Sequence, residues 1–349
     1  MMQEIVEGKW IDSFQRVLTL NGVKNGTVVA ILAETQSRPV MAQLAALACH
    51  NLKAQYATII LPTPANTAPV PVKSTGCCDA IQHMPHVVEA LKAADIVVDV
   101  TVEGLLHAEE WPAIEAAGTR LLTICNEHPE ILERTEPTKD LEAKVNLGIK
   151  LLRQAKIMRV TSKAGTDLTI NLTDAPCGGT PGFTTSPGGV AHWPGGICLA
   201  FPGKHTVNGT IVMDVGDMNL TFKQYLRDQV TLIVDNDYVT DIQGDNLDAD
   251  LFREYIAAWN DTEAYGFSHV GFGVNTAARW EAMALYDKGD VQATEFRAWA
   301  GNFLFSTGSN QYAGRFTLGH FDLPMRHCTI TLDDLPVVVD GRLVGELAE

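Results

Sequence analysis

Two histidines and one aspartate in the last third of the chain have the residue types and the spacing of a metal site. His320 and Asp322 lie two residues apart in TLGHFDLPM. Alternate residues of an extended strand point the same way, so both side chains can reach one ion. His269, in FSHVGFGVN, is the best-placed third ligand. Two imidazoles and one carboxylate hold a single Fe(II) on one face and leave its other positions open for O2 and a substrate.

The H-x-[DE] pattern occurs three times, and its surroundings differ. His107 with Glu109 and His128 with Glu130 lie in GLLHAEEWPAIEAA and NEHPEILER. Both segments are typical of helix starts, where residues two apart diverge around the helix axis. The pair at 320 and 322 has a β-like setting beside a glycine, which favours a metal site. From spacing alone, a buried histidine beside a turn-forming aspartate stays open as the alternative.

The composition is that of a globular protein with an acidic surface. The chain has 349 residues, enough for one large or two medium domains, and a formal net charge of −16. This charge argues against nucleic acid or an anionic membrane as a partner, because both require basic surface. The apolar runs are too short to span a bilayer and the first residues lack a signal-peptide pattern, so we expect a cytoplasmic protein.

Seven cysteines are scattered without the spacing of a disulfide framework, so we expect reduced thiols. Cys77 and Cys78 are adjacent. They could form a redox-active pair or could be two small side chains of a loop, and the sequence does not assign them a role.

The first 150 residues alternate short β-branched runs with helical segments. We expect strands at 27–33, 54–62, 96–102 and 119–124, and a helix at 38–50. Strands separated by helices of this length predict an α/β domain over 1–150 with a doubly wound, mostly parallel sheet. No G-x-G-x-x-G follows the first strand, so a dinucleotide site is not supported.

After a predicted helix at 139–154, the pattern changes to that of an α+β domain over 151–349. Residues 156–172 predict a hairpin, whereas the Gly/Pro-rich residues 174–196 have no regular structure by propensity. A loop of this length inside a compact domain is usually functional or disordered. Further elements are expected as strands within 209–218, 230–244 and 329–344, and as helices at 248–260 and 279–298.

Several segments of this C-terminal half follow, in order, the landmarks of a known family. RVTSKAGTDLTINL, the Gly/Pro-rich segment, HVGFGVNTAA and GHFD…TITLDD…VVVDGRLV resemble the thermophilic metallo-aminopeptidases of the leucyl type, over most of residues 155–345. Those peptidases hold two metal ions with several glutamates. Here the loop reads PGFTTSPGGV, without an acidic residue, and His269 stands where the resemblance would place a glutamate.

These departures resemble the family of 2,5-dihydroxypyridine 5,6-dioxygenases, Fe(II) ring-cleaving enzymes of bacterial nicotinate and nicotine breakdown on the same scaffold. The resemblance implies an aminopeptidase-like metal-binding domain with one Fe(II) per subunit on His269, His320 and Asp322. It also implies 2,5-dihydroxypyridine and O2 as substrates and N-formylmaleamate as product. Both oxygen atoms would enter the product, so no reductant is needed.

Such chemistry requires a proton shuttle near neutral pH, for which histidine is suited. His107 follows the third predicted strand, where doubly wound sheets bind ligands, and is the first choice because it would reach the site from the other domain. His192, in the Gly/Pro-rich segment, is the second. For both, a surface or helix-capping role stays open. Tyr265 and Ser306 are weaker candidates for hydrogen bonds to the pyridine ring.

Two other functions remain open from the sequence. Zinc with two histidines and one carboxylate is a legitimate catalytic arrangement, so the chain could be a metallo-aminopeptidase with a reduced ligand set. The loop without acids counts against this, because peptide hydrolysis needs a carboxylate base or a second metal to activate water. A non-catalytic binding protein on the same scaffold is the third possibility. The family likeness also suggests a homo-oligomer.

Overall fold

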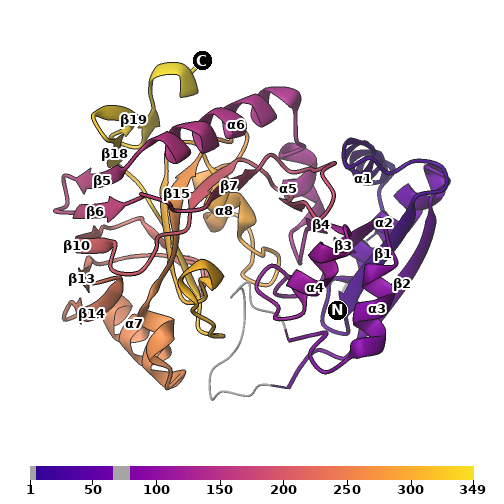
Figure 1. Ribbon diagram of the computed structural model, residues 1–349, viewed down its shortest axis with the longest axis horizontal. Coiled ribbons are helices and arrows are strands. Elements are labelled where there is room, and N and C mark those ends of the chain that lie inside the picture. The colour runs from indigo at the N-terminus through magenta and orange to yellow at the C-terminus, as the bar shows by residue number, and fades with distance from the viewer. Residues whose placement is uncertain (1–4, 66–78) are drawn as a thin grey trace.

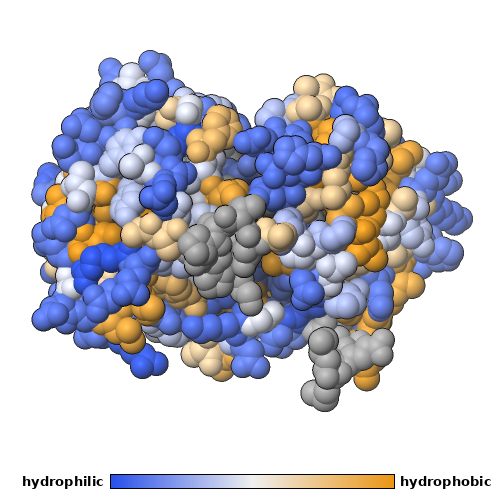
Figure 2. Space-filling view, turned by 90° about the horizontal axis from the view of Figure 1, so that it is seen from below, coloured by the Kyte–Doolittle hydropathy of each residue, from blue (hydrophilic) through white to orange (hydrophobic). Residues whose placement is uncertain are grey.

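The computed structural model describes residues 5–65 and 79–349, so Cys77 and Cys78 lie outside the described residues. The chain forms two halves that lie side by side (Figure 1). The N-terminal half, indigo to purple, is built on a parallel sheet, and the C-terminal half on antiparallel sheets. Figure 2 shows the halves as two lobes with a notch between them. No helix of the described residues is long and apolar enough to cross a membrane.

The N-terminal sheet is parallel throughout and has the order β2-β1-β3-β4-β8. Its strands span Gln55–Leu61, Val28–Glu34, Ile96–Asp99, Arg120–Thr123 and Val190–His192 in that order. Alternate residues of β1 point to opposite faces, so Val29 and Ile31 join the core under α1 (Gly8–Leu20) and α2 (Pro39–Asn51). Ala30 and Leu32 join the core under α3 (Pro85–Lys92) and α4 (Trp111–Ala116). The predicted doubly wound sheet is confirmed.

Strand β3 ends earlier than the predicted 96–102 because Asp99 turns the chain. Its carboxylate accepts hydrogen bonds from the Thr101 amide and hydroxyl at 3.0 and 2.6 Å and from the Leu105 amide at 2.7 Å. These bonds satisfy backbone donors that a longer strand would have paired with its neighbours. They also fix the loop that carries His107 away from the end of β3.

The Gly/Pro-rich segment is more regular than its composition predicts. It contains β7 (Cys177–Thr180) and β8, and β8 pairs in parallel with β4 so that His192 lies opposite Thr123. The expectation of a segment without regular structure is therefore wrong for these residues. The N-terminal sheet takes its fifth strand from beyond residue 150, and the division of the chain at 150/151 stays a prediction.

Helix α6 (Lys139–Gln154) has the predicted bounds and leads into the C-terminal half, where it packs on β7 and on β9 (Ile197–Ala200). The predicted hairpin at 156–172 is confirmed as β5 and β6. An eight-stranded antiparallel sheet has the order β14-β13-β10-β6-β5-β18-β19-β20, with strands Tyr238–Gln243, Val230–Asp235, Val207–Met213, Asp167–Asn171, Ile157–Ser162, Cys328–Leu332, Leu335–Val339 and Arg342–Leu343. One hydrophobic core joins it to a second sheet.

This second sheet is the one that carries the candidate ligands. It is antiparallel, with the order β17-β16-β15-β9-β7, and its first four strands span Phe321–Met325, Phe303–Thr307, Phe267–Gly273 and Ile197–Ala200. Every residue of β15, β16 and β17 is buried, which is why FSHVGFG and FLFST read as apolar runs. A short hairpin, β11 (Met218–Asn219) and β12 (Gln224–Tyr225), lies beside β17.

One predicted helix is wrong and one is confirmed. The helix expected at 248–260 is α7 (Leu247–Ala258), which Asn246 caps by accepting a hydrogen bond from the Ala249 amide at 3.0 Å. The helix expected at 279–298 is instead a 3-10 turn, η2 (Trp280–Ala284), and a short helix, α8 (Thr294–Ala298). Between them the chain turns at 287–290, and Ala293 has a left-handed φ of 87°, which no α-helix accommodates.

Candidate metal centre

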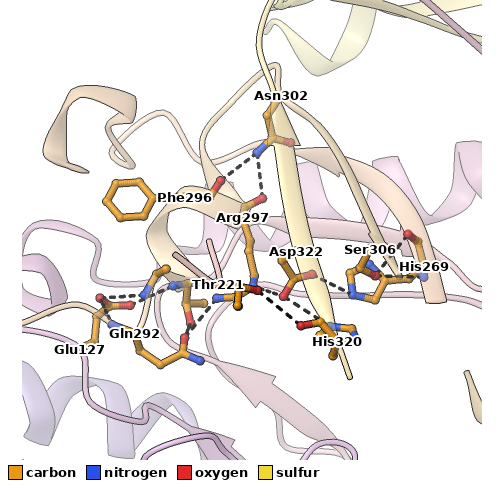
Figure 3. Close-up of polar contacts among 12 residues, drawn as sticks. Glu127, Thr221, His269, Gln292, Phe296, Arg297, Asn302, Ser306, His320 and Asp322 are labelled. Atoms are coloured by element: carbon orange, nitrogen blue, oxygen red, sulfur yellow. Dashed lines mark hydrogen bonds and ion pairs between the residues drawn. The ribbon is translucent and has the colours of Figure 1, made fainter. Parts of the chain in front are cut away.

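The three predicted ligands lie together at one end of the second antiparallel sheet (Figure 3). His269 belongs to β15, Asp322 to β17, and His320 directly precedes β17. Strand β16 lies between the two strands, and Ser306 on it is in register with Asp322. An extra residue in β15 between Phe267 and Val270 shifts the register there. Bulges of this kind re-aim side chains beside functional sites.

The geometry of the three side chains fits a single ion. Nε2 of His269 lies 3.4 Å from Oδ1 of Asp322, and Nε2 of His320 lies 3.5 Å from Oδ2 of the same carboxylate. One ligand atom from each residue can be chosen so that all three lie within 4.8 Å of one another. Ligand atoms bound to one transition metal at roughly 2.0–2.2 Å lie at comparable separations. The predicted His/His/Asp cluster is confirmed as a group that could hold a metal.

The hydrogen bonding around the cluster also fits a bound cation. Among the described residues, Oδ1 of Asp322 is buried and has no hydrogen-bond partner, and the same holds for Nδ1 of His269 and of His320. A buried polar atom without a partner costs free energy, and a cation beside Oδ1 would remove that cost for the carboxylate.

The charges favour the protonation states that bind metals. Burial by itself would raise the pKa of Asp322, but the Arg297 guanidinium, with a further contribution from the adjacent His320 side chain, outweighs burial and holds that pKa well below its usual range. Burial lowers the pKa of His269 to about 3, so this imidazole is neutral. An ionised carboxylate and a neutral imidazole are the forms that donate an electron pair to a metal.

A cavity opens directly on the cluster and is lined by both halves of the protein. From the C-terminal ends of the parallel strands come His107, after β3, Cys125, after β4, and His192, at the end of β8. Ligands of open α/β sheets bind at this edge. The cavity volume is about 70 Å³. On this measure a water takes roughly 10–15 Å³, so the cavity suits a compound of a few heavy atoms, such as one small ring.

The structure brings both predicted proton-transfer residues to this cavity. The His107 ring lies against His320, with ring centroids 5.1 Å apart. Burial, with a further contribution from the adjacent His320, lowers the pKa of His107 well below its ordinary value. Burial, with a contribution from Arg297, lowers the pKa of His192 to about 4.

Tyr265 and Ser306 are placed differently. Neither is among the described residues that line the cavity. Tyr265 ends the 3-10 turn η1 (Thr262–Tyr265) and packs against the core of the C-terminal half. The Ser306 hydroxyl accepts a hydrogen bond from the backbone amide of His269 at 3.2 Å, so it stands behind this ligand and holds its strand. Direct substrate contact by either residue stays a prediction.

Sequence reasoning missed Arg297, the cation of this site. Its Nε donates a hydrogen bond to Oδ2 of Asp322 at 2.7 Å, and the residue is 8% exposed. Gln292 and Thr294 line the cavity with it. The signal is an arginine flanked by apolar residues in FRAWA. The wrongly predicted helix at 279–298 led away from a buried position for this arginine, because an arginine on a long helix usually lies on the solvent-exposed face.

Comparison with known proteins agrees with this geometry. The family model for 2,5-dihydroxypyridine 5,6-dioxygenase matches residues 9–345. The chain belongs to this family. A curated member from Pseudomonas putida KT2440, named 2,5-dihydroxypyridine 5,6-dioxygenase, is 38% identical over 336 residues, which is 95% of each chain.

Two solved structures extend the comparison to the fold. That of 2,5-dihydroxypyridine dioxygenase from Pseudomonas putida KT2440 matches with a TM-score of 0.93 and 37% identity, over 99% of this chain and 100% of that one. AmpT from Thermus thermophilus matches with a TM-score of 0.67 over 97% and 99% of the two chains, but at 14% identity, so it shares the fold alone. The predicted aminopeptidase-like α/β fold is confirmed.

Replacement of His269 by Ala tests the ligand set. We expect the dissociation constant for Fe(II), measured by anaerobic competition with a chromogenic chelator, to rise by about 100-fold or more, because one of three protein ligands is lost. His50→Ala is the matched control. His50 is exposed near the C-terminal end of α2 and is not among the described residues that line the cavity, so metal affinity should not change. Wild-type affinity in the His269 variant would remove this residue from the ligand set.

Proposed function

We propose that this chain is an Fe(II)-dependent dioxygenase that cleaves 2,5-dihydroxypyridine between C5 and C6 with O2. The proposed product is N-formylmaleamate, and the proposed role is in nicotinate or nicotine breakdown. The observation that carries the proposal is the buried His/His/Asp cluster, which opens on a small cavity in a member of this family. Both oxygen atoms enter the product, so the reaction needs no external reductant.

The residues present fit Fe(II) as the metal. His269, His320 and Asp322 would hold it, and the bound ion would supply a redox-active centre with open positions for the substrate oxygen and O2. Arg297 keeps the Asp322 carboxylate ionised and binds its Oδ2, which would leave Oδ1 available to a bound metal. Most residues that line the cavity are buried, which would limit the access of bulk water to the reacting groups.

We assign proton transfer to His107, with His192 as the second candidate. Both side chains line the cavity that the metal cluster faces, and both come from the N-terminal sheet. His107 lies beside His320, where the hydroxyl of a bound ring would lie within reach. In this assignment an imidazole nitrogen of His107 takes the proton of the substrate hydroxyl and later returns it to the product.

The reaction is tested by anaerobic reconstitution with Fe(II), followed by addition of 2,5-dihydroxypyridine and air. We expect the near-ultraviolet absorbance of the substrate to fall while one O2 is consumed per ring. His269→Ala treated in the same way is the control and should show neither change. An inactive Fe(II) protein that cleaves leucyl anilides when loaded with Zn(II) would contradict the proposal and favour the aminopeptidase alternative.

Replacement of His107 by Gln tests the proton-transfer assignment. We expect kcat to fall by about 100-fold or more, the usual range for loss of a general acid or base, while Fe(II) affinity stays within about twofold of wild type. His192→Gln should lower kcat by less than about tenfold. Turnover of the His107 variant at the wild-type rate, or a larger loss in the His192 variant, would transfer the role to His192.

We also propose that the protein is a homo-oligomer and that β2 lies in the interface. Among the described strands, β2 is an edge strand that pairs with β1 alone, and its Tyr56 and Ile60 are 42% and 62% exposed. Hydrophobic residues are also prominent on the surface of the N-terminal lobe, at the right of Figure 2. Exposed apolar edge strands readily pair with another chain. A cytoplasmic location stays a prediction from the sequence.

The oligomer is tested by light scattering on the purified protein. For the wild type we expect a mass that is a multiple of 37.9 kDa, the mass of one chain. For Ile60→Lys we expect the mass to shift toward that of one chain, because a charge at this position opposes strand pairing. Lys92→Glu, on the partly exposed end of α3, controls for a change of surface charge and should keep the wild-type mass. A wild-type mass of one chain would overturn the oligomer.

A further inference from the structure

The segment that carries Arg297 to the metal ligands is held by side chains of the opposite half. Residues 290–297 belong to the C-terminal half, between η2 and the end of α8. Arg38, at the start of α2, lies 2.7 Å from the Asp290 carboxylate. Arg134, on α5 (Pro129–Arg134), makes two hydrogen bonds to the fully buried Glu295, at 2.5 and 3.0 Å. Side chains of the N-terminal half therefore set the position of this segment.

Glu127 makes the most direct of these contacts. It follows β4 in the N-terminal half and is 0% exposed. Its Oε1 accepts hydrogen bonds from the amides of Gln292 at 3.1 Å and Ala293 at 3.5 Å, and its Oε2 accepts one from the Thr294 amide at 3.0 Å. One carboxylate thus binds three consecutive backbone donors (Figure 3).

This carboxylate also stabilises an unfavourable backbone conformation. Ala293 has a φ of 87°, a left-handed value that costs free energy for any residue with a Cβ. Ala293 would relax toward an ordinary φ value if the three amides lost their acceptor. We therefore expect the path of residues 292–294 to depend on Glu127.

A short chain of hydrogen bonds connects this backbone to the metal ligand. The side-chain oxygen of Gln292 accepts hydrogen bonds from the Thr294 hydroxyl at 2.6 Å and from Nη1 of Arg297 at 3.2 Å. Nε of Arg297 then donates to Oδ2 of Asp322 at 2.7 Å. The orientation of the Arg297 fork is thereby tied to the backbone that Glu127 holds.

We propose that Glu127 is a positioning residue for the metal centre. By fixing residues 292–294 it sets the orientation of Arg297, and through Arg297 it sets which oxygen of Asp322 faces the ion. The packing of the two halves and the affinity for the metal are thus coupled through one buried carboxylate. The inference rests on the ligand role proposed for Asp322.

Glu127→Gln tests this coupling, because it keeps the shape of the side chain but replaces one acceptor oxygen with a donor. We expect the dissociation constant for Fe(II), measured anaerobically with a chelator, to rise by about tenfold, the lower end of the effect of residues that orient ligands. Glu130→Gln is the control. It removes the same charge from an exposed residue of α5 and should leave the affinity unchanged.

A double-mutant cycle with Arg297→Met separates positioning from a general loss of stability. If Glu127 acts through Arg297, adding Glu127→Gln to Arg297→Met changes the dissociation constant by less than about twofold, whatever value Arg297→Met has alone. A further tenfold change in the double variant, or wild-type affinity in Glu127→Gln, would overturn the inference. If Glu127→Gln does not fold, Glu127→Asp takes its place, since it keeps the charge but withdraws it from the three amides.

The cycle measures metal binding and does not require turnover, so it is independent of the proposed reaction. The reaction would be overturned and the positioning role supported if the wild-type protein bound Fe(II) but consumed no O2 with 2,5-dihydroxypyridine, while the effects of the two substitutions on Fe(II) affinity were not additive. Normal turnover with independent effects in the cycle would support the reaction and overturn the positioning role.

Discussion

A carboxylate as deeply buried as Asp322 would normally take up a proton, because burial disfavours its charge. The guanidinium of Arg297, 2.7 Å away, prevents this and keeps one oxygen occupied. The rest of the site depends on this ion pair. The ion pair keeps the Asp322 carboxylate, a candidate metal ligand between two imidazoles, in its ionised form, and it fixes the orientation of this carboxylate. Gln292 accepts a second hydrogen bond from the same guanidinium, which offsets part of the cost of burying the pair.

The two halves supply different parts of the site. The antiparallel sheet provides the candidate ligands His269 and Asp322 from strands that are buried along their whole length, and such strands hold side chains in fixed directions. The parallel sheet provides His107 and His192 from the C-terminal ends of its strands, where loops leave room for a ligand. The cavity lies where the two sheets meet. Strand β8 links the two halves there, because it lies beyond residue 150 in the chain but pairs with β4 of the N-terminal sheet.

The comparison with AmpT shows that this fold is shared well beyond recognisable sequence similarity. At 14% identity the two chains share their fold over nearly their full lengths, whereas the member from Pseudomonas putida shares both fold and sequence with this one. A fold of this kind can support different reactions, and the groups placed at its ligand edge decide which one. In this chain those groups are two histidines, one carboxylate and the arginine that orients it.

The sequence by itself was enough to predict the parallel and antiparallel halves, which follow from local periodicity. It was also enough to predict the candidate ligands and the family, which follow from the resemblance of short segments such as FSHVGFGVN and GHFD. The tertiary structure alone decided that Arg297 lies on Asp322, that Glu127 holds the backbone at 292–294, and that β8 crosses to the other sheet. Glu127 and Gln292 are 165 residues apart in the chain. No local pattern encodes such a contact, because it depends on how the two sheets pack rather than on the propensity of either segment.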